Sequence, residues 1–337
     1  MRHRNLVFAI QASMIFKAVR TAAFTIALTA SSLAQAGSCE EVNLTDQHQV
    51  FHGIPTFDQG GGQICYAYTA AQLVEGERVA QGHVFRREEA ISPMSIALNY
   101  ALANGQQNLQ QGGITCHAIE AMGNRSACPS AKSFKNLDDV AIYIAQFENC
   151  RAKKSSADCL TISSKVGSAR AVQLLSQSNP LFYVKAIEDQ MCFEKDRIRV
   201  NIPKCEMVNE ETFTADLYRA KADAVFNLRR PKPVEIGFSA HLLSYSGFPA
   251  KKYVISRKAE DDGFMFSIRY KPHSSMLLGR RLKNNKCQYL LRNSMGRSFC
   301  PSGLVQSAGW ECDAKSEGIW INAKELFDAT FEISYLP

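Results

Sequence analysis

The sequence predicts an α+β fold, built as one large domain or two medium ones. The chain has 337 residues of which 46% are hydrophobic, enough to bury substantial cores. Between Cys65 and about Arg229 the periodic segments are helical, whereas from Pro233 onward they become short runs of β-branched and aromatic residues. A helical part followed by a β part is typical of an α+β protein with two lobes.

The expected elements follow from these patterns. Apolar periodicity predicts four helices, with a serine at the cap position before the second: Cys65 to Gln81, Pro93 to Ala103, Leu137 to Phe147 and Thr212 to Leu228. Five strands are expected in the later part: Val234 to Phe238, Phe264 to Tyr270, Cys287 to Leu291, Gly318 to Asn322 and Phe331 to Tyr335. Residues 124–210 are rich in cysteine and show only loops and short helical patterns.

The first 36 residues have the pattern of a cleaved secretory signal peptide. Four basic residues precede an apolar stretch from Thr21 to Leu33, which ends in Ala34-Gln35-Ala36. Without this segment the charge falls from +7 to +3, because 35 Lys and Arg then face 32 Asp and Glu. We therefore expect an exported protein, periplasmic or extracellular in a bacterium, without a membrane span and without a nucleic-acid partner.

Eleven cysteines in an exported chain predict disulfides, and an odd number leaves one thiol free. If Cys65 is the free one, ten cysteines remain for five bridges. The spacing favours four local pairs, which leaves Cys39 for Cys287, although sequence does not fix the connectivity: Cys116 with Cys128, Cys150 with Cys159, Cys192 with Cys205, and Cys300 with Cys312. No Cys-x-x-Cys motif is present, which disfavours structural zinc.

Cys65 lies in a context that suits an activated thiol. A glycine-rich segment, residues 59–63, leads directly into the helix that begins at this cysteine. A helix N-terminus presents free backbone N–H groups and a partial positive charge, so we expect a lowered thiol pKa. Gln59, six positions upstream, can direct its amide N–H at an oxygen that becomes negative when the thiolate attacks a carbonyl.

A cysteine nucleophile needs a base and a group that orients the base. His273, at the start of an apolar run, and His241, after the strand-like run 234–240, are the two candidate bases. Asn293 follows a predicted strand and supplies an amide side chain. Each of these residues also has an ordinary structural interpretation: a buried thiol, a strand histidine or a turn-forming asparagine.

Together these motifs resemble the papain-like cysteine protease family. Gln59 and Cys65 match its glutamine and nucleophile in spacing, and Asn293-Ser294-x-Gly296 matches its asparagine motif. The other matching segments are Tyr66-Ala67-Tyr68 for Trp-Ala-Phe, Ile91-Ser92-Pro93 for Leu-Ser-Pro, Gly112-Gly113 for the substrate-binding glycines, and the spacing of His273 and Gly279. The resemblance covers roughly residues 50–122 and 230–322.

The resemblance implies a two-lobed fold in which a helical lobe, residues 37–230, carries the nucleophile and a β-barrel-like lobe, residues 231–337, carries His273 and Asn293. It implies hydrolysis of peptide bonds in polypeptide substrates, with Gln59 in the oxyanion hole and with Gly112, Gly113, Tyr66 and Met295 around the substrate. Neither a cofactor nor a metal is implied, and we expect a monomer.

Several departures favour a second hypothesis, a catalytically weak or inactive papain-like module that binds peptides or proteins. Met295 stands where the family has tryptophan. His273 follows Cys65 by 208 residues, whereas about 130 to 150 separate the pair in papain, so an insertion within 124–210 is expected. Only 22 residues separate Gly37 from Gln59, which leaves no room for the family's long propeptide.

Overall fold

The computed structural model describes residues 39–60, 62–122, 126–153, 157–209, 212–243, 272–294 and 309–337. The chain divides into two compact units, Met1–Glu40 and Glu41–Pro337, and nearly all described residues belong to the second. The expected signal segment and the expected strand at 264–270 lie outside the described residues. None of the described helices is long and apolar enough to cross a membrane.

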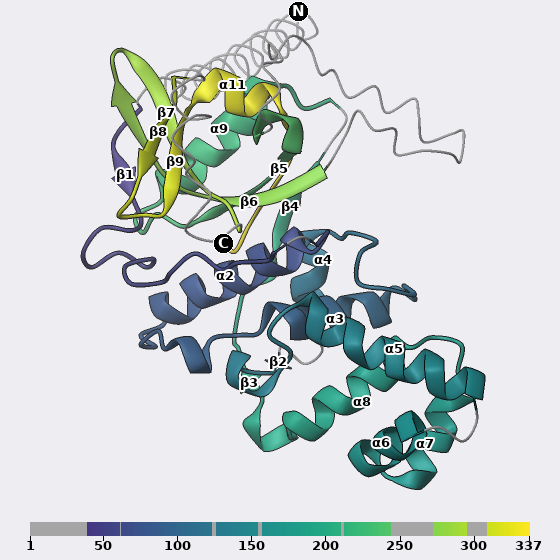
Figure 1. Cartoon of the computed structure of the whole chain (residues 1–337). Helices are drawn as coiled ribbons and strands as arrows, with labels where there is room; N and C mark the ends of the chain where they lie inside the picture. The colour runs from purple at the N-terminus through teal and green to yellow at the C-terminus, as the bar shows by residue number, and fades with distance from the viewer. Residues whose placement is uncertain are drawn as a thin grey trace, which may run out of the picture. The chain divides into compact units, whose positions relative to one another are not determined.

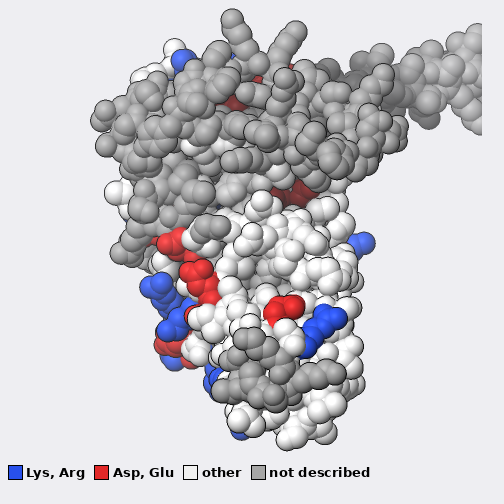
Figure 2. Space-filling model, turned by 45° about the vertical axis from the view of Figure 1, so that its right-hand side comes forward, with Lys and Arg blue, Asp and Glu red and all other residues white. Residues whose placement is uncertain are grey.

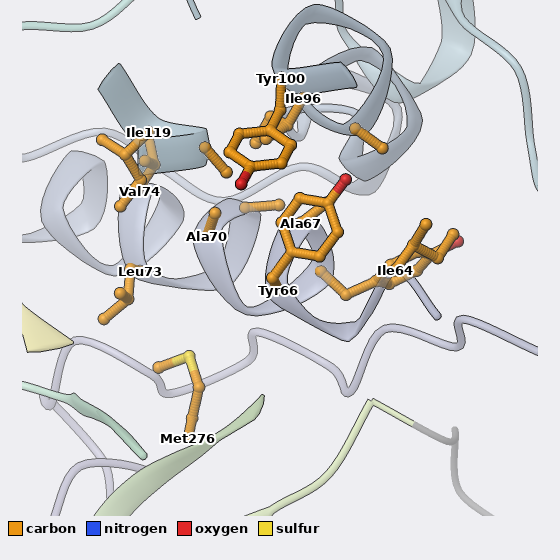
Figure 3. Packing of buried hydrophobic residues seen from close by; sticks show 14 of the residues in the cluster. Ile64, Tyr66, Ala67, Ala70, Leu73, Val74, Ile96, Tyr100, Ile119 and Met276 are labelled. Carbon is orange, nitrogen blue, oxygen red and sulfur yellow. The ribbon is translucent and has the colours of Figure 1, made fainter. Parts of the chain in front are cut away.

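Helix α2 (Cys65–Ala80) is the central helix of the unit. Its residues from Tyr66 to Gly76 are all buried, as expected for a helix packed on every side. Helix α3 (Pro93–Ala103) packs against it and begins where Ser92 accepts a hydrogen bond from the Ser95 backbone N–H, 3.1 Å away. Figure 3 shows Tyr100 of α3 beside Tyr66 and Ala67 of α2.

The remaining described helices form two groups (Figure 1). Helices α4, α5, α6, α7 and α8 lie with α2 and α3, whereas α9 and α11 pack on each other and on the sheet. Their bounds are α4 (Thr115–Glu120), α5 (Leu137–Lys153), α6 (Ala157–Val166), α7 (Ser168–Leu175), α8 (Leu181–Met191), α9 (Ala215–Phe226) and α11 (Ala323–Asp328), with short 3-10 turns η1 (Arg87–Glu89), η2 (Ser130–Lys132), η3 (Glu194–Asp196) and η4 (Ala240–Leu243).

An eight-stranded antiparallel sheet dominates the rest of the unit, which confirms the α+β class. The order is β4-β10-β5-β6-β7-β9-β8, with β1 also pairing with β6. The strands are β1 (Val42–Asn43), β4 (Glu206–Val208), β5 (Val234–Ser239), β6 (Pro272–Lys283), β7 (Lys286–Arg292), β8 (Glu311–Asp313), β9 (Gly318–Asn322) and β10 (Thr330–Tyr335), and a separate pair is formed by β2 (Ser126–Ala127) and β3 (Ile198–Arg199). Closure of the large sheet into a barrel stays a prediction.

The register of β5 and β6 gives the sheet two different faces near the predicted site. Phe238 of β5 lies opposite His273 of β6, and their rings meet edge to face with centroids 5.5 Å apart. Because side chains alternate along a strand, Ser274 lies on the other face, together with Met276 and Glu235. In Figure 3 the side chain of Met276 points toward Leu73 of α2, so this second face of the sheet is turned toward the central helix.

The disulfides correct part of the expected connectivity. Cys150 pairs with Cys159 as predicted, but Cys116 pairs with Cys205 and Cys128 with Cys192. The local pairs Cys116–Cys128 and Cys192–Cys205 were therefore wrong, because the fold brings residues 64 and 89 positions apart into contact. Cys39, Cys287 and Cys312 are also disulfide-bonded, whereas Cys300 lies outside the described residues.

Charged side chains on the described surface are mixed in sign. On the face shown in Figure 2, acidic and basic residues lie next to one another in small groups among uncharged ones. Some exposed ion pairs lie within one helix, such as Lys324 with Asp328, and others join two strands of the sheet, such as Lys283 of β6 with Glu311 of β8. Pairs of this kind contribute little stability, and the pattern fits the small net charge of the chain after residue 36.

Candidate active site

Cys65 is the first residue of α2, and it is the free cysteine of the described residues. The Ile64 carbonyl accepts the N–H groups of Ala67 and Tyr68, which closes the first turn. The N–H groups of Tyr66, of Cys65 itself and of Ser274 each lower the pKa of the thiol. The sulfur therefore lies at the helix N-terminus and against the residue that follows His273.

The net effect on the thiol differs from the sequence-based expectation. Burial raises the pKa of the half-buried Cys65 above its ordinary value of 9.0, and it outweighs the three N–H groups; the nearby Glu235 carboxyl raises this pKa further. The expected lowering at a helix N-terminus is thus present as a contribution but does not dominate. In the free site the thiol is therefore the favoured form of Cys65 at neutral pH.

The imidazole of His273 is bonded to Asn293, with 2.6 Å between Nε2 and Oδ1. The orientation of the Asn293 amide is fixed, because the same Oδ1 accepts the backbone N–H of Ser294 at 2.8 Å. An oxygen can only accept here, so Nε2 carries the ring proton. The other ring nitrogen, Nδ1, then has a free lone pair when the ring is neutral, as a base requires.

Burial also acts on the imidazole. His273 is 8% exposed and Asn293 is fully buried. Burial lowers the pKa of His273 below 6.5, and the hydrogen bond to Asn293 offsets part of this effect. The ring is thus neutral at neutral pH, which makes it an acceptor for a thiol proton rather than a standing cation. Ser275 adds a second support, since its Oγ donates to Asn293 Oδ1 at 3.2 Å.

Gln59 is 4% exposed and is held in place by Ser294, the residue after Asn293. Its backbone N–H donates to the Ser294 carbonyl at 2.8 Å, and its Oε1 accepts from Ser294 Oγ. Its Nε2 donates one hydrogen to the Gly62 carbonyl at 2.8 Å, which leaves a second hydrogen for another acceptor. Ser294, which is 235 positions away in the sequence, thus fixes the Gln59 amide that was predicted for the oxyanion hole.

The predicted substrate-binding residues lie in different settings. Gly112 has a positive φ of 72°, which favours glycine, and Gly113 lies over the rings of Tyr66 and Tyr100, where an added Cβ would come within 2.7 Å of both. Tyr66 is 1% exposed and packs against Tyr100 with tilted rings and centroids 4.9 Å apart, so it supports Gly113 from beneath. Met295 lies outside the described residues.

The structure brings together Cys65, the segment of His273, Asn293 and Gln59. The alternative base His241 lies in η4, directly after β5. Sequence reasoning assigned no role to four polar residues in or near the site, although Ser294 belongs to the asparagine motif: Ser274, Ser294, Glu235 and Glu332. A signal was present for the two serines, since each directly follows a predicted site residue. Among the described residues no cluster of His, Cys, Asp and Glu is arranged to hold a metal ion.

Comparison with known proteins gives similarity at the level of solved structures. No family model matches the chain, and no curated protein matches it. Xylellain, a cysteine protease from Xylella fastidiosa, is similar with 13% identity and a TM-score of 0.48 over 90% of this chain and 88% of its own. A digestive procathepsin L 3 from Tenebrio molitor larval midgut has 13% identity and a TM-score of 0.44 over 88% and 69%.

Bromelain from Ananas comosus, solved in complex with the E64 inhibitor, is similar with 13% identity and a TM-score of 0.43 over 88% of this chain and 97% of its own. Because identity and TM-score are this low, we base the function on the residues of the site itself.

Proposed function

We propose that this chain is an exported thiol peptidase that hydrolyses peptide bonds, with Cys65 as nucleophile, His273 as base, Asn293 as orienting group and Gln59 in the oxyanion hole. The observation that carries the proposal is the bond from His273 Nε2 to Asn293 Oδ1, because it leaves Nδ1 as the basic nitrogen. The thiol of Cys65 is free and lies against the backbone N–H of Ser274, the residue that follows His273, which supports the same assignment.

The steps follow from these groups. The Cys65 sulfur attacks the substrate carbonyl carbon while its proton moves to His273 Nδ1. The carbonyl oxygen becomes an oxyanion, which accepts hydrogen bonds from the Cys65 backbone N–H and from the second Nε2 hydrogen of Gln59. His273 then gives its proton to the leaving amine as the C–N bond breaks. Water, deprotonated by the same ring, cleaves the resulting thioester and restores the thiol.

The segment around Gly113 is the proposed binding site for the substrate backbone. Because Gly113 has no side chain, it can lie directly on the rings of Tyr66 and Tyr100, and its exposed backbone is proposed to form main-chain hydrogen bonds with an extended peptide. Tyr66 and Tyr100 support this segment with two packed rings and leave the surface side of the glycine free of their side chains. Met295, next to the bonded pair Asn293–Ser294, is proposed as an apolar neighbour of the substrate.

A catalytically weak or inactive peptide-binding module is the second candidate. The observation that favours it is burial of both reacting groups, which raises the pKa of Cys65 and lowers the pKa of His273. These directions disfavour a standing thiolate and imidazolium pair in the free protein. The module and the peptidase differ in one measurable property, the reactivity of the thiol toward a substrate-like electrophile.

The test is covalent labelling of the protein, residues 37–337, with a peptidyl epoxide, together with cleavage of a fluorogenic peptide library. We expect stoichiometric labelling at Cys65 and peptide turnover, both abolished in Cys65→Ala. As a matched control, Cys150→Ala with Cys159→Ala removes a disulfide remote from the site and should leave labelling intact. A folded wild-type protein that neither labels nor cleaves would refute the peptidase and favour the binding module.

A further inference from the structure

A buried carboxyl lies directly behind the site, on the face of the sheet that is turned toward α2. Glu235 of β5 is 1% exposed, and its Oε1 accepts a hydrogen bond from Ser274 Oγ at 2.9 Å. Ser274 Oγ is also 3.1 Å from Thr115 Oγ1. The second carboxyl oxygen, Oε2, is buried and has no hydrogen-bond partner among the described residues. Burial of a carboxyl with one unpaired oxygen costs free energy, which makes Glu235 a candidate for a functional role.

The hydrogen bonds that join Glu235, Ser274 and Thr115 reach two sides of the site. Ser274 directly follows His273 on β6, and its backbone N–H faces the Cys65 sulfur. Thr115 is the first residue of α4, two positions after Gly113. The carboxyl of Glu235 thereby connects the strand that carries the base with the helix that follows the proposed substrate-binding glycine. The hydroxyls of Ser274 and Thr115 are both needed to connect β6 with α4 in this way.

The surroundings of Glu235 favour its protonated form. Burial is the main cause that raises the pKa of this carboxyl well above its ordinary value, and Glu332 on the neighbouring strand β10 raises it further. The polar groups around it are hydroxyls, those of Ser274, Thr115 and Ser334. Within the described residues neither Glu235 nor Glu332 forms an ion pair. A protonated carboxyl can still accept from Ser274 through its carbonyl oxygen, so the chain persists in the neutral form.

We propose that Glu235 is a positioning residue for the reaction: by holding Ser274 Oγ it fixes the Ser274 backbone N–H against the Cys65 sulfur and fixes the adjacent His273 on β6. This role rests on the proposed function in that Cys65 is the reacting thiol. Glu235 does not touch the substrate. It acts through Ser274, and its effect should vanish when the Ser274 hydroxyl is removed.

The test compares two substitutions of Glu235 with one of Ser274. Glu235→Gln keeps an oxygen that accepts from Ser274, whereas Glu235→Met has a similar volume and no such acceptor. Ser274→Ala removes the hydroxyl and keeps the backbone N–H. The measurement is the second-order rate of Cys65 alkylation by iodoacetamide from about pH 6 to about pH 11, a range that extends above the ordinary thiol pKa of 9.0, with the thermal unfolding midpoint as a control for folding.

We expect Glu235→Met and Ser274→Ala each to lower the alkylation rate about tenfold, the size of effect expected for loss of one buried hydrogen bond, and Glu235→Gln to stay within about threefold of wild type. The double variant Glu235→Met, Ser274→Ala should be no slower than either single variant, because both remove the same link. In Glu235→Gln the half-maximal pH of alkylation should fall, since the carboxyl of Glu235, when ionised, raises the pKa of Cys65. A purely structural role would not move this midpoint.

The proposal is overturned if Ser274→Ala and Glu235→Met alkylate at the wild-type rate, or if their effects multiply in the double variant. Should Glu235→Met fail to fold, Ser274→Ala and Glu235→Gln decide the question by the same criteria. If the wild type cleaves peptides and the Glu235 variants alkylate at the wild-type rate, the positioning role is refuted and the peptidase proposal stands. Alkylation that follows the expected pattern without any peptide cleavage would refute the peptidase and support the positioning role.

Discussion

Replacing Glu332 by glutamine should remove a pH-dependent loss of stability. Burial raises the pKa of Glu332 from 4.5 to about 7 in the folded protein. A carboxyl whose folded pKa is raised binds more protons in the folded state than in the unfolded one between these two pH values. Its contribution to the free energy of unfolding is therefore full below about pH 4.5 and is lost as the pH rises through about 7.

The size of this loss follows from the two pKa values. A change from 4.5 to about 7 corresponds to about 3 kcal/mol of unfolding free energy. In Glu332→Gln this part disappears, and the part due to Glu235 becomes smaller, because Glu332 raises the pKa of Glu235. We thus expect the variant to lose less stability than wild type between pH 4.5 and 7.5, with a difference between the two losses of at least about 3 kcal/mol.

The assay is urea unfolding at a series of pH values, followed by the fluorescence of Trp310 and Trp320. Glu311→Gln is a control of opposite sign, because Lys283 and Arg281 lower the pKa of the Glu311 carboxyl. That variant should be less stable than wild type at neutral pH and should approach it as the pH falls. Parallel stability curves for wild type and Glu332→Gln from pH 4.5 to 7.5 would refute the reasoning.

Two further predictions concern catalysis and the disulfides. Gln59→Ala should lower kcat on peptide substrates by about 10² to 10³, with little change in KM, because it removes a donor used mainly in the transition state; a change below about threefold would exclude Gln59 from the oxyanion hole. Removing Cys116–Cys205 by double alanine substitution should cost more unfolding free energy than removing Cys150–Cys159, about 4 to 5 against about 2 to 3 kcal/mol, since the loops span 89 and 9 residues. The reverse order in urea unfolding would contradict the loop-entropy account.

Elements with strong local signals were predictable from the sequence. The helix 93–103 was predicted with the bounds of α3, because Ser92 and Pro93 form a clear start. The strand 318–322 was predicted with the bounds of β9. Two predicted cysteine pairs, Cys116–Cys128 and Cys192–Cys205, were wrong for the opposite reason: Cys116 meets Cys205 only after α4 and the segment before α9 are folded together, and no local pattern records this contact.

The residues of the candidate site likewise differ in whether the sequence alone could reveal them. Gln59 and Cys65 were recognisable from their spacing and their glycine-rich segment. Glu235 was not, because a glutamate in a short strand is ordinarily assigned to the solvent-exposed face. Its burial depends on the pairing of β5 with β10, which brings it beside Ser334 and near Glu332. The raised pKa of Cys65 was missed for a related reason, since burial of the thiol depends on the packing of α2 against β6.

In the proposed mechanism, the opposite pKa shifts of Cys65 and His273 favour a proton transfer that occurs as one event. Burial disfavours the isolated thiolate and the isolated imidazolium alike. When the proton moves from sulfur to nitrogen both charges form together, and two unit charges about 4 Å apart attract by about 4 kcal/mol at an effective dielectric constant of about 20. This attraction can offset the burial of both groups, whereas ionising either alone gains nothing. The pair should therefore titrate as a unit, and a pH–rate profile would report values that belong to the pair.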